Sequence, residues 1–233
     1  MTWGLFGLSL AVLALALVLH AVVPNTRPQP SVAVTPGRLT VTIEPTATLR
    51  ITYLGDSLTA GLHAVEETDS FRSRTTEALA SGGPVEEQAT KIVGGTVRQT
   101  LEGNPDLPND QDIYVVQLGT NDFNDGDYRA FQRDYGELLD RVRAASPDAA
   151  LVCLGTWRPA EQASRWDLVI RGACEAHNGR YDRMSDLAAD DTMVGPAGRD
   201  TFSGPSDDFH PNNAGHRAIS DRLMAMVEVE RIG

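Results

Sequence analysis

The sequence is short of cysteine and of basic residues, and each shortage excludes a class of function. Its two cysteines, Cys153 and Cys174, do not have the spacing of a metal-ligating set. Its 20 lysines and arginines are outnumbered by 32 aspartates and glutamates, which gives a formal net charge of −12. A chain with so few cations offers no basic stripe to neutralise phosphates, so we expect no nucleic-acid partner.

Three common catalytic motifs are missing as well. The sequence has no Gly-x-Ser-x-Gly turn, which disfavours the α/β-hydrolase fold. It has no Gly-Lys-Ser/Thr phosphate loop and no His-Glu-x-x-His zinc motif, and its five histidines include no metal set of known spacing. We therefore expect no metal and no organic cofactor.

The apolar run from Trp3 to Val23 is long enough to cross a bilayer as a helix, and it also fits the apolar region of a secretory signal peptide. We expect residues 1–23 to be a signal peptide or a transmembrane anchor, and the rest to be extracytoplasmic, secreted or membrane-anchored. Five prolines between residues 24 and 48 predict a Pro/Thr-rich linker. Within it, the alternation of Leu39–Ile43 is also that of an edge strand or hairpin.

Residues 49–233 are expected to form one domain of alternating strands and helices. A 3- and 4-residue apolar spacing predicts a helix over Asp127–Ala145 with Asp127 as N-cap, and a last helix runs from about Asn213 to Val229. Short apolar runs predict five strands: Leu49–Leu54, Ala89–Val93, Asp112–Leu118, Ala150–Gly155 and Arg180–Met184. This alternation favours a parallel sheet between helix layers, with the binding site at the carboxyl ends of its strands.

Four short motifs follow this framework in order. Gly55-Asp56-Ser57-Leu58, Gly94 and Gly119-Thr-Asn121-Asp122 each follow a predicted strand, and Asp207-Asp-Phe-His210-Pro211 lies late in the chain. Together they resemble the SGNH (GDSL-type) hydrolase family, in the family's order. The resemblance implies a flavodoxin-like α/β fold, a three-layer α/β/α sandwich with a five-stranded parallel sheet.

The residue types in these motifs suit nucleophilic catalysis. Ser57 is the candidate nucleophile and needs a base to activate it. His210 is the candidate base, because imidazole titrates near neutral pH, and Asp207 can orient its ring. Asp208 is the rival orienter, but the family pattern has Asp three positions before His, which selects Asp207 and leaves Asp208 as a surface carboxylate.

The resemblance also implies an oxyanion hole, the set of donors that binds the developing negative charge. Its members would be the backbone N–H groups of Ser57 and Gly94 and the side-chain amide of Asn121. Gly94 and Gly95 are both available for the second position, and the family's block matches best with Gly94 in that role. Asp56 is interpreted as a local hydrogen-bonding residue and His216 as a packed or exposed helical histidine.

Two further features leave alternatives open. Trp157, just after the fourth predicted strand, is either a wall of the acyl pocket or an ordinary packed aromatic. Cys153 and Cys174 either form a disulfide, as an exported domain allows, or remain two buried thiols.

The sequence therefore predicts a serine hydrolase that cleaves carboxylic esters, as an esterase or lipase, through an acyl-enzyme on Ser57. The substrate would be a small-molecule, lipid or acylated-glycan ester. The alternatives are a cell-envelope glycan O-acetyl esterase or an acyltransferase on the same three residues, and from another class, a non-catalytic binding module. The membrane would be a partner through residues 1–23 if they are not cleaved.

Overall fold

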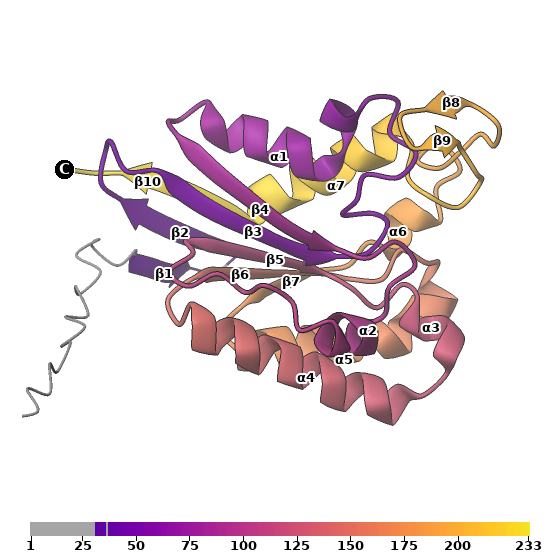
Figure 1. Cartoon of the computed structure of the whole chain (residues 1–233), viewed down its shortest axis with the longest axis horizontal. Helices are drawn as coiled ribbons and strands as arrows, with labels where there is room; N and C mark the ends of the chain where they lie inside the picture. Colours follow the sequence, from indigo (N-terminus) through magenta and orange to yellow (C-terminus); the bar gives the residue numbers. More distant parts are fainter. Residues whose placement is uncertain (1–30, 36) are drawn as a thin grey trace, which may run out of the picture.

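The computed structural model describes residues 31–35 and 37–233 (Figure 1). The expected signal peptide or anchor at residues 1–23 and the first part of the expected linker lie outside the described residues. Within the described ranges, no helix is both long and apolar enough to cross a membrane.

A five-stranded parallel sheet forms the centre of the molecule, and it confirms the predicted fold class. Its spatial order, β4-β3-β5-β6-β7, places the second strand outside the first and then runs on in chain order, as in flavodoxin-like folds. The strands are β3 (Leu49–Gly55), β4 (Val85–Lys91), β5 (Ile113–Gln117), β6 (Ala150–Leu154) and β7 (Arg180–Asp182).

Helices cover both faces of this sheet and complete the three layers (Figure 1). On one face lie α1 (Phe71–Ala80) and α7 (Asn213–Met226). On the other lie α2 (Val97–Glu102), α4 (Tyr128–Ala145) and α5 (Ala160–Ala176). Short helical turns connect these elements: η1 (Glu67–Asp69), α3 (Asp122–Asp125) and α6 (Ser185–Ala188).

Burial on both faces explains why the central strands are continuous apolar runs. Every residue of β5 and of β6 is buried, which is the pattern expected when helices pack against both sides of a parallel sheet. The predicted α4 is also confirmed, because the Asp127 side chain accepts the N–H of Ala130 and the helix ends at Ala145, just before Ser146. Strand β4 begins earlier than expected, since this edge strand is rich in charge and shows no apolar run at its start.

A second sheet changes the expected start of the domain. It consists of β1 (Ser31–Thr35), β2 (Arg38–Ile43) and β10 (Val227–Arg231), in the order β1-β2-β10. Leu39 and Val41 of β2 are completely buried in the main core. The folded domain therefore begins before residue 49, and the linker interpretation is wrong for β1 and β2, whereas the alternative strand at Leu39–Ile43 is correct.

Because of the same sheet, the last helix is shorter than the sequence predicts. It ends at Met226 instead of Val229, because Val227 and Val229 lie on β10, where Val227 pairs with Leu39 in parallel. The alternation Val-Glu-Val-Glu fits a strand once β2 supplies a partner.

Two smaller features complete the fold. A hairpin of β8 (Asp200–Thr201) and β9 (Gly204–Pro205) lies near the carboxyl edge of the central sheet (Figure 1). A disulfide joins Cys153 on β6 to Cys174 on α5, so the cysteines are paired and not free.

Candidate active site

The candidate site lies where the two central strands β3 and β5 end. These strands are neighbours and parallel, so Ser57 after β3 and Asn121 after β5 meet at the same edge. The turn at Ser57 begins at Gly55, where a Cβ atom would lie 2.0 Å from Thr59 Oγ1 and 2.8 Å from the carbonyl oxygen of Gln117. Only glycine therefore allows the turn to pack this tightly.

Asp56 stabilises the turn through a hydrogen bond to its backbone, as expected of a structural hydrogen-bonding residue. It is completely buried, and its Oδ1 accepts the backbone N–H of Leu58 at 2.9 Å. Burial raises the pKa of Asp56 to about 7, although hydrogen bonds from Leu58 and Gln117 oppose the shift.

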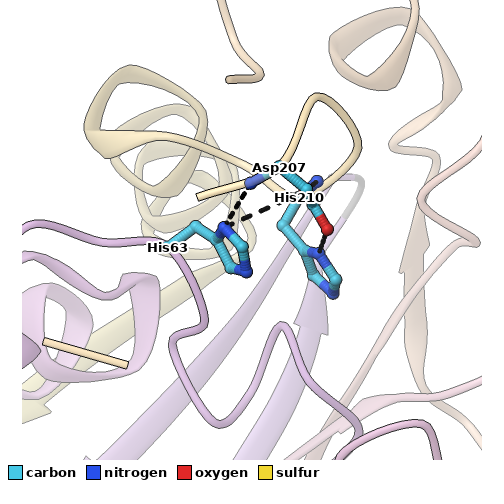
Figure 2. Close-up of side chains that lie close together, drawn as sticks. All are labelled: His63, Asp207 and His210. Atoms are coloured by element: carbon cyan, nitrogen blue, oxygen red, sulfur yellow. Dashed lines mark hydrogen bonds and ion pairs between the residues drawn. The ribbon is translucent and has the colours of Figure 1, made fainter. Parts of the chain in front are cut away.

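Ser57, His210 and Asp207 form a hydrogen-bonded line across the site. His210 Nε2 lies 2.9 Å from Ser57 Oγ. On the other side of the ring, His210 Nδ1 lies 2.8 Å from Asp207 Oδ2, a contact that Figure 2 shows. An ionised carboxylate only accepts, so Nδ1 carries the proton and Nε2 is free to accept the Ser57 hydroxyl. The structure thus brings together the three residues that the sequence singled out, in the geometry that proton transfer requires.

Asp207 is held in place and in its charged form by the loop that carries it. Its Oδ1 accepts the backbone N–H groups of Phe209 at 2.9 Å and of His210 at 2.8 Å. Partial burial raises the pKa of Asp207, but these bonds and the His210 ring outweigh it and hold the pKa at about 2. Asp207 is therefore ionised at neutral pH.

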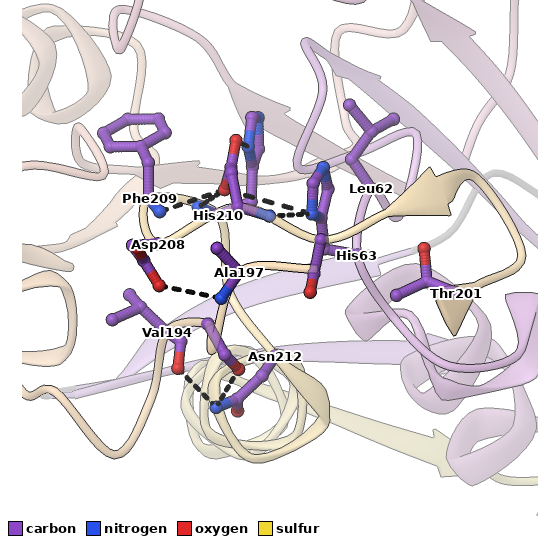
Figure 3. Close-up of polar contacts among 12 residues, drawn as sticks. Leu62, His63, Val194, Ala197, Thr201, Asp208, Phe209, His210 and Asn212 are labelled. Atoms are coloured by element: carbon purple, nitrogen blue, oxygen red, sulfur yellow. Dashed lines mark hydrogen bonds and ion pairs between the residues drawn. The ribbon is translucent and has the colours of Figure 1, made fainter. Parts of the chain in front are cut away.

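Neighbouring residues anchor this loop to the start of α7 (Figure 3). Asp208 is exposed and its Oδ1 accepts the N–H of Ala197 at 2.8 Å, so the rival orienter faces away from His210. The Asn212 side chain caps α7 through the N–H groups of Ala214 and Gly215, and it donates to the carbonyl oxygen of Val194 at 2.8 Å.

Asn121 and Gly94 lie in the same pocket as Ser57 and His210. Asn121 Nδ2 donates to the carbonyl oxygen of Gly95 at 3.0 Å and, more weakly, to Asp56 Oδ2 at 3.3 Å. A substrate oxygen in the pocket would compete for the hydrogen of the longer bond. Gly94 has a φ of +73°, a left-handed conformation that favours glycine, and a Cβ there would meet no atom within 4 Å, because the position faces open space.

His63 is a site residue that the sequence analysis missed. Its ring stacks on His210 with centroids 4.7 Å apart and planes 8° apart, and its Nδ1 accepts the backbone N–H of Asp207 at 2.8 Å (Figure 2). His63 has a φ of +69°, an uncommon conformation for a residue other than glycine. The one sequence signal was the histidine itself, six residues after Ser57 and outside the four motifs.

The environment of His63 keeps its ring neutral. Burial lowers the pKa of His63, and the neighbouring His210 acts in the same direction while Asp207 opposes them. Its Nδ1 accepts a hydrogen bond, so the proton is on Nε2.

The same residues do not make a ready metal site. His63, Asp207 and His210 have potential ligand atoms within 4.8 Å of one another. However, His63 Nδ1 already accepts the Asp207 N–H, and His210 Nδ1 already donates to Asp207 Oδ2. A metal ion bound through these two Nδ1 atoms would have to break both bonds, and the second of them orients His210.

The pocket that contains Ser57 has a volume of about 330 Å³. Its walls are Ser57, Val93, Gly94, Asn121, Asn124, Arg158, Phe209 and His210. Trp157 is not among them: it is completely buried, and its Nε1 donates to the carbonyl oxygen of Phe209 at 2.7 Å. The pocket-wall interpretation of Trp157 is therefore wrong and the packed-aromatic one correct, while the next residue, Arg158, faces the pocket.

His216 lies behind the site and is also completely buried. Its Nδ1 accepts the N–H of Phe71 at 3.2 Å and its Nε2 donates to the carbonyl oxygen of Leu62 at 3.0 Å. Both ring nitrogens have protein partners, so it is the packed histidine of the two expected alternatives. It fixes the segment that leads to His63.

A flavodoxin-like sheet that carries a Ser-His-Asp line at its carboxyl edge, with Asn121 and Gly94 in the same pocket, defines a serine-hydrolase type of site. The family comparison agrees with this class. The model of the GDSL-like lipase/acylhydrolase family matches residues 53–218, from β3 into α7. The chain belongs to this family.

Individual relatives cover parts of the chain. The cellulase/esterase CelE of Acetivibrio thermocellus is 30% identical over 118 residues, which are 50% of this chain and 14% of CelE. A carbohydrate esterase family 2 enzyme with a carbohydrate-binding domain, from Corynascus thermopiles (Myceliophthora fergusii), is 17% identical with a TM-score of 0.57 and covers 77% of this chain and 65% of its own. Phospholipase A1 from Streptomyces albidoflavus NA297 is 17% identical with a TM-score of 0.56, over 77% and 99% of the two chains. The two structural likenesses establish a shared fold.

Proposed function

We propose that this protein is a serine esterase that hydrolyses carboxylic esters of short acyl chains through an acyl-enzyme on Ser57. The observation that carries the proposal is the unbroken line from Ser57 Oγ to His210 to Asp207, with distances of 2.9 and 2.8 Å. Membership of the GDSL-like lipase/acylhydrolase family supports the same chemistry.

The geometry supports a two-step reaction. Ser57 Oγ attacks the ester carbonyl carbon while its proton passes to His210 Nε2. The N–H groups of Ser57 and Gly94 and the Asn121 amide bind the oxyanion, and the alcohol leaves with the proton from His210. Water then attacks the acyl-enzyme and gives a proton to His210, the acid leaves, and the proton returns to Ser57. Asp207 remains ionised throughout and stabilises the imidazolium.

The size of the pocket favours a short acyl group. Its volume of about 330 Å³ is near the lower end of the range of small-molecule sites, about 300–1,000 Å³. The alternative, removal of O-acetyl groups from an envelope glycan, fits the same pocket. A relative named as a cellulase/esterase, CelE, is 30% identical over half of this chain, which keeps a carbohydrate ester among the candidate substrates.

Hydrolysis of 4-nitrophenyl esters from acetate to palmitate tests the proposal. We expect the rate to be highest for the shortest chains, and Ser57→Ala to lower kcat by at least about 10³-fold. Ser81→Ala is the matched control, since Ser81 is exposed at the end of α1. Full activity in Ser57→Ala would contradict the proposal, and an optimum at palmitate would contradict the short acyl chain.

We also propose that the domain acts outside the cytoplasm, secreted or anchored by residues 1–23. The apolar sequence from Trp3 to Val23 and the Cys153–Cys174 disulfide support this location, since disulfides persist in oxidising compartments. Fractionation of cells that express the full chain would test it: recovery in the cytoplasm with free thiols would contradict the proposal.

A further inference from the structure

Arg158 is the one wall residue of the Ser57 pocket with a permanent positive charge, within the part of the chain that the structure describes. It lies on the loop between β6 and α5, next to the buried Trp157. The chain has 20 basic residues against 32 acidic ones, yet none of the residues that line this pocket is acidic. Such a cation beside the reacting serine needs an explanation.

The guanidinium is held in place without a carboxylate. Its Nε donates to the carbonyl oxygen of Thr120 at 3.0 Å and its Nη2 to Asn124 Oδ1 at 3.3 Å. It also lies over two aromatic rings, 4.6 Å from the centroid of Phe123 and 5.2 Å from that of Phe209. These contacts fix the group at the pocket wall and leave part of its five-donor fork unused.

Two other arginines of the described chain have more polar partners. Arg98 pairs with Asp134 at 3.1 Å, and Arg143 donates to the carbonyl oxygens of Pro147, Ala149 and His177. Among the described residues no acidic group compensates Arg158, and burial alone lowers the pKa of its guanidinium. A partly desolvated cation of this kind costs free energy until an anion binds to it.

We infer that Arg158 makes this pocket specific for esters that carry an anionic oxygen group, a carboxylate or phosphate, close to the ester bond. The inference rests on the proposed esterase function and names the substrate class. The planar fork of arginine matches such groups with two parallel hydrogen bonds. The small pocket puts the bound anion close to the ester carbonyl, because Arg158 shares the cavity with Ser57.

Matched pairs of esters test this inference. One pair places the charge on the acyl half, mono(4-nitrophenyl) glutarate against its neutral methyl ester. The other places it on the alcohol half, 3-acetoxybenzoate against methyl 3-acetoxybenzoate. We expect the wild type to prefer the anionic member of one pair, which identifies the half that Arg158 binds.

The variant Arg158→Gln then tests the contribution of the Arg158 charge alone, because it removes this charge and leaves the other site residues unchanged. A hydrogen bond to a charged group contributes about 1.5–3 kcal/mol, so kcat/KM for the preferred anionic ester should fall by about 10- to 100-fold, mainly through KM. For its neutral partner we expect a change of less than about threefold. Arg158→Lys should recover part of the loss, since it keeps the charge and lacks the fork. Equal losses on both members of the pair, or no anionic preference in the wild type, would overturn the inference.

Arg165→Gln is the matched control. Arg165 also lies over an aromatic ring, 3.9 Å from the centroid of Tyr128, but it is on α5 and outside the pocket. We expect it to leave the preference for anionic esters unchanged. A loss of the preference in this variant would mean that the overall charge of the protein sets it, and would overturn the role of Arg158.

A binding measurement keeps this inference separate from the hydrolysis itself. In the Ser57→Ala protein, NMR titration with monomethyl glutarate and with dimethyl glutarate needs no turnover. Stronger binding of the anion, lost on adding Arg158→Gln, would support the anion site even if no ester were hydrolysed. Equal binding of both compounds would overturn it even if the esterase were active.

Discussion

The line of Ser57, His210 and Asp207 is supported by the loop that holds Asp207, and also by His63, which acts on the His210 ring. His63 stacks on His210 and also accepts the N–H of Asp207, so it contacts two members of the line. The hairpin of β8 and β9 also contacts His63: Ser203 lies in its turn, and Ser203 Oγ accepts the backbone N–H of His63 at 3.1 Å. The uncommon φ of His63 is thus maintained by its surroundings.

At the residue scale, we predict that His63→Asn lowers kcat by about threefold to tenfold and changes KM little. Asparagine tolerates a positive φ, so the backbone is preserved while the stacked ring is lost. A stacked aromatic pair contributes about 0.5–1.5 kcal/mol, which sets the size of the effect. Steady-state kinetics with a 4-nitrophenyl ester measures it, and His177→Asn at the end of α5 is the control. An unchanged kcat would show that the stacking does not position His210.

The four sequence motifs identified most of the site because each is local. Ser57, Asn121, Asp207 and His210 all fall within short stretches whose composition carries the signal. His63 was missed because its contact with Asp207 spans 144 residues and depends on a left-handed turn. Trp157 was left between two interpretations for a related reason: the sequence places an aromatic after β6 but does not say whether its ring or the following Arg158 faces the pocket.

At the level of helices and strands, the sequence predicted the elements whose own apolar residues follow a regular pattern. The central parallel sheet was predicted from its buried runs, and α4 from its regular apolar face. The second sheet was not, because β2 and β10 pair across almost the whole chain, Leu39 with Val227. Prolines near β2 favoured a linker, and only tertiary pairing shows that its alternating apolar residues are buried.

This second sheet leads to a prediction about stability. Leu39 is completely buried, so Leu39→Ala should lower the free energy of unfolding by about 2–5 kcal/mol. Thr40→Ala, one residue further on the partly exposed face of β2, should change it by less than about 1 kcal/mol. Urea denaturation of both variants measures the difference. If residues 24–48 were a linker, both substitutions would be neutral.

At the scale of the whole molecule, buried titratable groups make stability depend on pH. Burial lowers the pKa of His216 to about 4, whereas a histidine in the unfolded chain titrates near 6.5. The stability that neutral His216 contributes is therefore complete above about pH 6.5 and is lost as the pH falls toward 4. Asp56 acts in the opposite sense, because its raised pKa of about 7 favours the folded state at low pH and that stability is lost as the pH rises from about 4 to 7.

A variant isolates the contribution of His216. We predict that His216→Gln lowers the free energy of unfolding by about 1–3 kcal/mol at pH 7.5, because buried partners lose their hydrogen bonds. This loss should shrink by about 1–2 kcal/mol at pH 5, where the wild type no longer has the full benefit of a neutral ring. Urea denaturation at the two pH values measures both numbers, with His177→Gln as the control. An equal loss at both pH values would contradict the assignment.

The proposed mechanism depends on Ser57 as the nucleophile, and covalent labelling tests this role of Ser57 without the need for a substrate. We would treat residues 31–233 with a fluorophosphonate probe and identify the modified residue by mass spectrometry, alongside Ser57→Ala and Ser81→Ala. We predict one adduct, on Ser57, in the wild type and in Ser81→Ala, and none in Ser57→Ala. Absence of label on folded wild-type protein, or an adduct on another residue, would contradict it and favour a binding module that has only the geometry of an enzyme.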